Sequence, residues 1–276
     1  MSKKSISIIG LGWIGLPLAK ELIESDFSVV GSTTTSQKAK DLNESGVPAI
    51  QFSLIPYPSG EGFQKLFQSE TLVINIPPRT KSNGGEHFLE QMKFLLGLVE
   101  NSTVKKIIFI SSSGVYPSNF KDGEYTEEEL ITDENTGNSW LWKAENFWKE
   151  KFKGDLTIIR FGGLLGDERV PGKYFSNKEN VTGHTPVNYI HRQDSTRLIQ
   201  FVIEKNLWNQ TLNGVAPIHP IRKDVYEKNA TDLGIDPPKS FAPQKDGEKR
   251  VISGNRIIEL GFEFIFPNPL DFPYSL

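Results

Sequence analysis

The stretch Ile6–Leu18, ISIIGLGWIGLPL, decides the fold prediction. It begins with a short apolar run, continues through Gly10, Gly12 and Gly15 at G-x-G-x-x-G spacing, and passes directly into apolar residues at helical spacing. A strand, a glycine turn and a helix in this order form the first third of a β-α-β unit that binds a dinucleotide. The stretch therefore predicts a coenzyme site at the end of the first strand.

Each glycine has a different physical task in such a turn. Gly10 permits the tight turn, Gly12 lets a pyrophosphate approach the main chain, and Gly15 lets the helix pack closely on the strand. The helix N-terminus also presents N–H groups and a partial positive charge to phosphates. Together with Trp13 and Ile14, the glycines are predicted to hold the pyrophosphate through the main chain.

The end of the second predicted strand, 27–31, bears on the choice of coenzyme. A free ribose 2′-hydroxyl usually meets an Asp or Glu there, but residues 32–38 read STTTSQK and contain no carboxylate. Hydroxyl donors and one lysine suit a 2′-phosphate better, because hydrogen bonds to charged groups are stronger than neutral ones. We therefore expect Ser32, Thr33, Thr34 and Lys38 to face the adenosine ribose, and NADP is favoured over NAD. The alternative is that this segment caps the helix that follows it.

Two buried strands are predicted to end at the ligand edge of the sheet. The apolar run 71–76 stops at Pro77-Pro78, where a central strand cannot continue. Asn75, Ile76 and Pro77 are therefore candidate coenzyme contacts, with a simple strand-ending loop as the alternative. The run 105–110 opens onto Ser111 and Ser112, whose hydroxyls would face the same crevice or cap a turn.

The remaining pattern alternates strands and helices. Apolar positions at helical spacing predict a helix over 86–100 and an aromatic helix from Ser139, whose buried side should carry Trp140, Ala144, Phe147, Trp148 and Lys151. Residues 118–138 are predicted to form a polar loop. Further strands are expected at 48–52, 156–161 and 211–215, and further helices at 37–45, 195–204 and 223–233. The C-terminal segment FEFIFPNPLDFPYSL is expected to be strand material interrupted by prolines.

Alternation of this kind predicts an α/β fold, a Rossmann-type doubly wound parallel sheet with a smaller C-terminal substrate lobe. We expect residues 1–166 to form the coenzyme domain, to which the chain returns at about 187–216. Residues 167–186 and 217–276 would then form the smaller lobe.

Composition excludes several other classes of protein. Of 276 residues, 37% are hydrophobic and 24% charged, which suits a globular chain. The net charge of −3 gives no sign of nucleic acid or an anionic membrane as partner. No signal peptide or spanning segment is evident, so a cytoplasmic location is expected. The absence of Cys excludes thiolate ligands, and the four scattered histidines predict no metal site.

In their order and spacing, the motifs resemble the extended and atypical short-chain dehydrogenase/reductase superfamily, the NAD(P)-dependent epimerase/dehydratase-like proteins. The resemblance covers nearly the whole chain, through the motifs GLGWIG, SSSGVYP, KAE, RFGGLLGDER, NYIHRQD and NRIIELGFEF. It implies that Ser112 hydrogen-bonds the reacting oxygen of a small substrate such as a nucleotide-sugar, and that Lys143 binds the nicotinamide ribose. It also implies a homodimer formed by the 86–100 helix and the aromatic helix, and a structural turn at Asn188, His191 and Asp194.

Two departures from the family pattern stand out. Ile9 occupies the place of the first glycine of G-x-x-G-x-x-G, and Ser139 occupies the place of the catalytic tyrosine. A tyrosine of pKa about 10 can be brought toward working pH by a lysine ammonium, whereas a serine hydroxyl is a far weaker acid. Tyr116 and Tyr189 are candidate substitutes, and Arg160 and Arg169 could meet an anionic substrate or pair with carboxylates.

Three functional hypotheses follow. The first is an oxidoreductase or epimerase with an atypical active site. The second is a non-catalytic NAD(P)-binding sensor or regulatory protein, which the missing tyrosine suggests. The third rests on GLGWIGLPLA alone, which resembles the opening of 3-hydroxyacid dehydrogenases, but the proline-rich C-terminus argues against the all-helical second half of that group.

Overall fold

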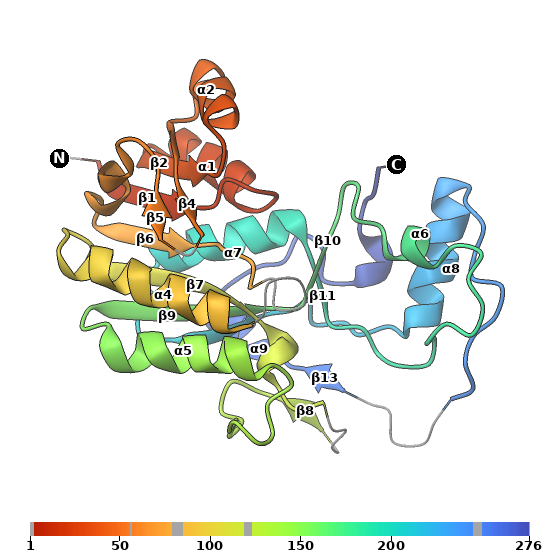
Figure 1. The fold of residues 1–276 in the computed structure, drawn as a ribbon. Helices are drawn as coiled ribbons and strands as arrows, with labels where there is room; N and C mark the ends of the chain where they lie inside the picture. Colours follow the sequence, from red (N-terminus) through yellow and green to blue (C-terminus); the bar gives the residue numbers. More distant parts are fainter. Residues whose placement is uncertain (1–2, 56, 79–84, 119–122, 245–249, 276) are drawn as a thin grey trace. The chain divides into compact units, whose positions relative to one another are not determined.

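The computed structural model describes residues 3–55, 57–78, 85–118, 123–244 and 250–275. Its main sheet has seven strands in the order β12-β9-β7-β6-β1-β2-β3 (Figure 1). These strands are β1 (Ser5–Ile9), β2 (Ser28–Thr33), β3 (Ala49–Gln51), β6 (Thr71–Ile74), β7 (Lys106–Ser112), β9 (Asp155–Phe161) and β12 (Thr211–Gly214).

The strand order places the ligand edge. Strands β2 and β3 follow β1 on one side of it in the sheet, and the next strand of the sheet, β6, lies on the other side of β1. The pairs β1–β2, β2–β3, β1–β6 and β6–β7 are all parallel. In such sheets the crevice lies where the order reverses, here at the carboxyl ends of β1 and β6. The predicted Rossmann-type doubly wound sheet is confirmed.

Helices follow most of these strands. They are α1 (Gly15–Glu24), α2 (Ser36–Glu44), α4 (Gly85–Glu100), α5 (Ser139–Lys151), α6 (Pro171–Phe175), α7 (Arg192–Glu204), α8 (Arg222–Leu233) and α9 (Asn255–Glu259), with short 3₁₀ helices η1 (Phe63–Phe67), η2 (Ser113–Val115) and η3 (Pro269–Asp271). The minor strands are β4 (Ser53–Leu54), β5 (Pro58–Ser59), β8 (Glu124–Tyr125), β10 (Gly163–Leu165), β11 (Tyr189–His191) and β13 (Val251–Ile252).

The chain forms two compact units that interleave along the sequence. Unit 1 contains Met1–Ser111, Asn138–Ile159 and Ile199–Thr211, and unit 2 contains Ser112–Gly137, Arg160–Leu198 and Leu212–Leu276. The segments expected to form a substrate lobe, 167–186 and 217–276, both lie in unit 2.

The aromatic helix α5 differs from its prediction. Its buried side carries Leu141, Ala144, Glu145 and Trp148, whereas Trp140 and Phe147 are only partly buried and Lys151 is exposed. Helix α5 lies beside α4 (Figure 1), and the Trp140 ring occupies the space that a side chain at Gly85 would need. The expected stripe was therefore wrong by about one residue, because the aromatic rings dominated the pattern over the smaller residues that face inward.

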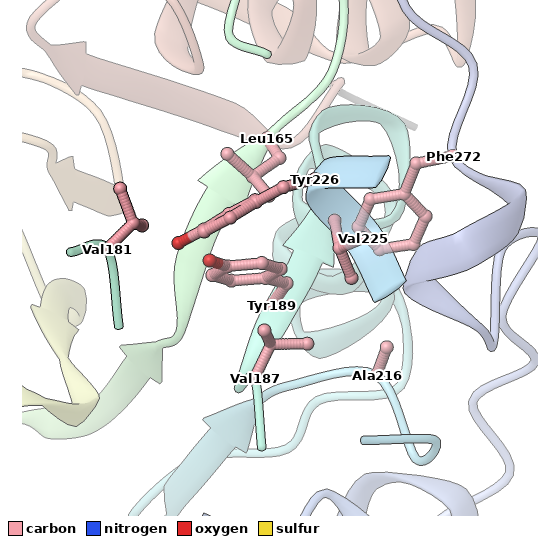
Figure 2. Close-up of a cluster of buried hydrophobic side chains, with 8 residues drawn as sticks. All are labelled: Leu165, Val181, Val187, Tyr189, Ala216, Val225, Tyr226 and Phe272. Atoms are coloured by element: carbon pink, nitrogen blue, oxygen red, sulfur yellow. The ribbon is translucent and has the colours of Figure 1, made fainter. Parts of the chain in front are cut away.

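Unit 2 has a core of its own. Figure 2 shows eight buried side chains gathered around Tyr189 and Tyr226, namely Leu165, Val181, Val187, Tyr189, Ala216, Val225, Tyr226 and Phe272. They come from β10, β11, α8 and the loops, with Phe272 directly after η3. The ring of Phe175 in α6 stacks on that of Tyr226, with centroids 4.9 Å apart.

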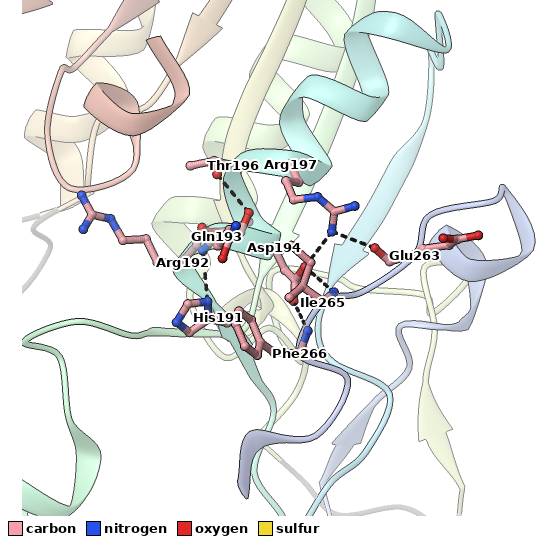
Figure 3. A network of polar contacts seen from close by, with 10 residues as sticks. His191, Arg192, Gln193, Asp194, Thr196, Arg197, Glu263, Ile265 and Phe266 are labelled. Atoms are coloured by element: carbon pink, nitrogen blue, oxygen red, sulfur yellow. Dashed lines mark hydrogen bonds and ion pairs between the residues drawn. The ribbon is translucent and has the colours of Figure 1, made fainter. Parts of the chain in front are cut away.

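The C-terminal segment was expected to be strand material, and this prediction was wrong. Residues 262–266 form no strand. Instead, the main-chain N–H groups of Ile265 and Phe266 donate to the buried Asp194 carboxylate at 2.9 and 2.8 Å (Figure 3). Prolines at 267, 269 and 273 lack N–H donors and interrupt any ladder. A carboxylate at the start of α7 therefore holds this segment.

Candidate functional site

The glycine turn between β1 and α1 leaves no space for side chains at two of its three glycines. Gly10 has φ of +105°, and a Cβ there would lie 2.5 Å from the main-chain oxygen of Asn75. A Cβ on Gly15 would overlap the main-chain oxygen of Gly10. Only glycine fits at either position, so the turn, the end of β6 and the first turn of α1 are packed against one another.

Gly12 is different, and it tests whether the turn fits a coenzyme. A Cβ added at Gly12 would have no atom of the described chain within 4 Å, and its φ lies outside the range that favours glycine. Neither packing nor backbone geometry within the chain requires glycine there. Open space over a main-chain turn at a helix N-terminus is what an approaching diphosphate needs.

Residues from β2 and α2 fix the turn in place. The N–H of Gly10 donates to Ser32 Oγ at 3.1 Å, and the N–H of Leu11 donates to the Ser32 carbonyl at 2.7 Å. Lys38 Nζ donates to the Leu11 carbonyl at 3.0 Å. Because Ser32 engages the first two amides, the amides that could face phosphates are those from Gly12 onward, at the start of α1.

A cavity of about 220 Å³ opens beside this turn in unit 1. Seven of the predicted coenzyme residues line it together: Gly10, Ser32, Thr33, Thr34, Asn75, Ile76 and Pro77. The sequence interpretation missed another group of lining residues, Phe52, Ser53, Leu54, Ile55, His87 and Gln91. Only the strand order brings β4 and α4 to this edge, and Gln91 Nε2 ties them together by donating to the Leu54 carbonyl at 2.5 Å.

Ser111 and Lys143, the other two predicted contacts in unit 1, have partners in the protein. Ser111 is buried at the end of β7 and donates its hydroxyl to the buried Glu145 carboxylate of α5 at 2.5 Å. Lys143 lies on α5, two residues before Glu145, with Nζ 5.1 Å from the centroid of the Trp140 ring. The Ser111 hydroxyl therefore joins β7 to α5.

Ser112, the predicted catalytic serine, begins the first turn of unit 2. It caps η2, and its Oγ accepts a hydrogen bond of 3.1 Å from the N–H of Gly114. That bond uses a lone pair of the hydroxyl oxygen, so the hydroxyl hydrogen can be directed toward another acceptor. Ser112 is partly buried, as a residue at the edge of a site should be.

Neither of the two tyrosines that the sequence offered for proton transfer, Tyr116 and Tyr189, is suited to it. Tyr116 is fully buried, and its hydroxyl donates to Asn213 Oδ1 at 2.9 Å. Tyr189 is also buried, and its hydroxyl accepts from Arg222 at 3.3 Å. Burial raises the pKa of both phenols, although Arg160 opposes the rise at Tyr116 and Arg222 opposes it at Tyr189. Both groups are held as neutral structural phenols.

Of the two arginines proposed from sequence for an anionic substrate, Arg160 is only 4% exposed, and its guanidinium lies 5.0 Å from the centroid of the Tyr116 ring. Neither Arg160 nor Arg169 lines the cavity beside the glycine turn or the second cavity, in unit 2.

The second cavity, of about 420 Å³, lies within unit 2 and presents two other arginines. Arg222 begins α8, and its Nε donates to Thr185 Oγ1 at 2.8 Å. Arg250 precedes β13 and lines the same cavity, which also includes Phe175 and Tyr226. Among the residues that the structure describes, neither arginine forms an ion pair with a carboxylate. Two partly buried cations without counter-ions favour an anionic ligand.

Comparisons with known proteins agree with this architecture. The family model for the NAD binding domain of 6-phosphogluconate dehydrogenase matches residues 5–78, which span the glycine turn and the end of β6. By structure, the chain resembles the UDP-glucose 4-epimerase of Thermotoga maritima solved with UDP-glucose. The TM-score is 0.76 at 20% identity, over 95% of this chain and 94% of that one.

Relatives by sequence include Protein YeeZ of Escherichia coli (strain K12), 32% identical over 98% of this chain and 99% of the relative. Another is Epimerase family protein YfhF of Bacillus subtilis (strain 168), 24% identical over 62% of each chain. The chain belongs to the same family as Protein YeeZ, its residues 5–78 match an NAD-binding domain, and its more distant relatives are named epimerase family proteins.

Two further observations concern only the described part of the chain. No helix there combines the length and the apolar character that crossing a bilayer requires. The same residues contain no group of three or more His, Asp or Glu side chains arranged to hold a metal ion.

Proposed function

We propose that the protein is an NAD(P)-dependent oxidoreductase or epimerase that acts on a nucleotide-sugar and has an atypical active site. The observation that carries this proposal is the second cavity. A protein that only reports coenzyme needs one ligand site, whereas this chain has a further cavity with two cations and a stacked aromatic pair. A nucleotide diphosphate would offer charge to Arg222 and Arg250 and a base or sugar face to Phe175 and Tyr226.

In this proposal Ser112 hydrogen-bonds the reacting oxygen of the substrate, and Lys143 holds the nicotinamide ribose. When bound, the coenzyme supplies hydride transfer. Because Ser139 replaces the family's tyrosine and the two nearby phenols are buried, the proton that accompanies hydride transfer would pass through the Ser112 hydroxyl to solvent or to a group on the substrate. We accordingly expect slow turnover: oxidation of the sugar releases this proton and should speed up as pH rises, whereas reduction takes it up and should slow.

The coenzyme is proposed to be NADP. Thr34 is exposed at the cavity, and the first turn of α2, capped by Thr35, offers main-chain amides beside it. No acidic residue between 31 and 38 would repel a 2′-phosphate. Lys38 contacts the glycine turn at Leu11, so its charge lies close to the same ribose.

The test has two stages. Thermal unfolding is first measured with NAD, NADP and their reduced forms, where saturation at about 100 times the dissociation constant adds roughly 2.7 kcal/mol of stability. The protein is then incubated with 4-deuterated NADPH and a panel of keto nucleotide-sugars, whose carbonyl carbon accepts the deuteride while its oxygen takes up a proton, and deuterium in the sugar is measured by mass spectrometry. Transfer to a member of the panel supports the enzyme. A stabilising coenzyme with no transfer to any member contradicts it.

A second candidate function, a non-catalytic NAD(P)-binding sensor, is favoured by the buried hydroxyls of Tyr116 and Tyr189. A sensor binds oxidised and reduced coenzyme with different affinity and transfers no deuterium. Comparing dissociation constants for NADP and NADPH therefore separates this candidate from the first, which needs both turnover and a second ligand.

We also propose a cytoplasmic homodimer in which α4 and α5 form the shared face. Several partly buried apolar side chains on these helices, among them Leu89, Phe94, Trp142 and Phe147, would gain burial in such a pair. Light scattering gives the mass directly, and a monomer at micromolar concentration contradicts the proposal.

A further inference from the structure

Arg250 contacts two parts of unit 2 that are distant in sequence. Its side chain lines the second cavity. At the same time, its Nη2 donates to the main-chain carbonyls of Ser113 at 2.8 Å and Tyr116 at 3.1 Å. These carbonyls belong to the turn that begins at Ser112 and closes with the N–H of Tyr116 donating to Ser113. One guanidinium therefore contacts both the cavity wall and the serine turn.

The main chain of Arg250 is also fixed. Asn188 Nδ2 donates to the Arg250 carbonyl at 2.8 Å, and Asn188 Oδ1 accepts from the N–H of Ile252 at 2.7 Å. Directly after Arg250, β13 pairs with β8. The main chain is thus held on the carbonyl side of Arg250, which limits how far the backbone can carry the side chain away from its contacts.

The far end of the turn is held independently. The Tyr116 hydroxyl donates to Asn213, whose side-chain amide donates to the Ser253 carbonyl at 3.0 Å and whose N–H donates to Glu127 at 2.7 Å. This network fixes the tyrosine ring, and the Val115 carbonyl of the turn accepts from the Gly137 N–H at 3.2 Å and from Thr136 Oγ1 at 2.7 Å. Arg250 holds the carbonyls of Ser113 and Tyr116. Removing the guanidinium would therefore loosen the Ser112 end of the turn without releasing the ring.

The guanidinium has unused hydrogen-bonding capacity. Arg250 Nε is buried and makes no hydrogen bond within the described part of the chain. Burial lowers the pKa of Arg250, opposed by Tyr125 and Tyr116 nearby. An anion in the cavity would give this buried cation a counter-ion and a second set of hydrogen bonds.

We propose that Arg250 is a positioning residue that links the second cavity to Ser112, so that an anionic group bound in the cavity orders the turn presenting the serine hydroxyl. The cavity's ligand is taken from the proposed function, so this link rests on that proposal. The holding of the turn by Arg250 rests only on its hydrogen bonds to the carbonyls of Ser113 and Tyr116.

The experiment uses the full chain, with amide hydrogen exchange at Gly114 and Tyr116 as readout and UDP and inorganic pyrophosphate as probes. Arg250→Met keeps the apolar stem and removes the guanidinium, and Arg250→Lys keeps the charge with a single nitrogen. Both should exchange about tenfold faster than wild type at the two amides, since two charge-assisted hydrogen bonds are lost. UDP should slow exchange at least threefold in wild type and leave it unchanged in Arg250→Met.

Arg222→Lys is the matched control, because Arg222 lines the same cavity and makes no contact with the turn. It should weaken UDP binding, leave basal exchange at wild-type rates, and regain the protection at saturating UDP. If Arg250 had only a structural role, Arg250→Met would exchange faster without ligand, but UDP would still slow its exchange.

Two results overturn the inference: wild-type exchange rates in both Arg250 variants, or UDP protection in Arg250→Met equal to that in wild type. If wild type binds neither UDP nor pyrophosphate, the proposed nucleotide site is refuted. The basal exchange rates then still decide whether Arg250 holds the turn. Circular dichroism and melting temperature identify a variant that has failed to fold, in which case the other variant supplies the comparison.

Discussion

The side-chain amide of Asn75 donates a hydrogen bond of 3.1 Å to the main-chain carbonyl of Gly10. This bond joins the carboxyl end of β6 to the carboxyl end of β1, the two neighbouring strands between which the sheet order reverses. A Cβ on Gly15 would lie 3.1 Å from the same amide nitrogen. Asn75 therefore contacts the glycine turn at both Gly10 and Gly15, where β1, β6 and α1 pack together.

Replacing Asn75 by Ala should weaken coenzyme binding more than it weakens the fold. The lost bond is worth about 0.5–1.5 kcal/mol, and the freed Gly10 carbonyl would let the turn move. We expect an affinity loss of about 5- to 30-fold for the preferred dinucleotide by calorimetry. Asn101→Ala is a matched control, because Asn101 donates a similar bond of 3.0 Å to the Gly97 carbonyl in α4. Equal losses of coenzyme affinity in both variants would contradict the role given to Asn75.

Substitutions at Gly12 and Gly15 should separate binding from folding. Gly12→Val meets open space in the protein and should melt near the wild-type temperature, yet lose the shift caused by dinucleotide. Gly15→Ala meets the Gly10 carbonyl and should cost at least 1–3 kcal/mol of stability, the usual cost of overpacking. Thermal unfolding with and without NADP measures both. An unchanged ligand shift in Gly12→Val would mean that the phosphates lie elsewhere.

The grouping of residues around the cavity beside the glycine turn could be predicted from the sequence because its determinants are local. Gly10, Gly12 and Gly15 follow one another at fixed spacing, and proline at 77 marks the end of a buried strand. Seven residues predicted on these grounds line one cavity. The lining residues that were missed, such as His87 and Gln91, reach the cavity only through the packing of α4, which no local pattern encodes.

The second cavity could not be predicted for the same reason. Arg250 contacts carbonyls 134 and 137 positions earlier in the chain, and Arg222 contacts Thr185 across 37 positions. Neither arginine stands in a motif with fixed spacing. The tail FEFIF failed as a strand prediction because its partner is a single carboxylate, Asp194, and not a neighbouring strand.

Asp194 should be among the most destabilising positions to mutate. It is fully buried and accepts from Ile265, Phe266 and, at 3.0 Å, Arg197 (Figure 3). Asp194→Ala leaves two amides and a guanidinium without their acceptor, and the loss should reach about 3–5 kcal/mol. Asp194→Asn keeps one acceptor oxygen and should lose less. Chemical unfolding gives the energies, and limited proteolysis should cut near residue 265 first; a loss below about 1 kcal/mol for Asp194→Ala would contradict this role.

Coenzyme preference should respond to Thr34, which is exposed at the cavity and follows β2 directly. A carboxylate there would repel a 2′-phosphate and could accept from a 2′-hydroxyl. We expect Thr34→Asp to lower NADP affinity at least tenfold and to leave NAD affinity equal or higher. Thr34→Asn has the same shape without the charge, so it should change the ratio of the two affinities much less. If Thr34→Asp bound NADP as tightly as wild type does, the 2′-phosphate could not lie beside residue 34.

His191 should make stability depend on pH. Its ring is 5% exposed and packs edge-on against Phe266 and Phe272, with centroids 4.3 and 5.4 Å away. Burial lowers the pKa of His191 below its usual value near 6.5, opposed by Asp194 and a main-chain contact at Pro273. The unfolded chain therefore takes up a proton first as pH falls, so the stability from the neutral ring is full above about 6.5 and is lost below it, toward the lower folded-state pKa.

His191→Phe keeps an aromatic ring against Phe266 and should flatten the fall in unfolding free energy between pH 7 and 5, by at most about 1.36 kcal/mol per pH unit. Burial also lowers the pKa of His219, so part of the fall should remain until that ring is replaced too. His184→Phe, at a partly exposed position, controls for the loss of one histidine. Chemical unfolding at several pH values gives the slopes. A slope in His191→Phe as steep as that of wild type would show that the protein's acid sensitivity arises elsewhere.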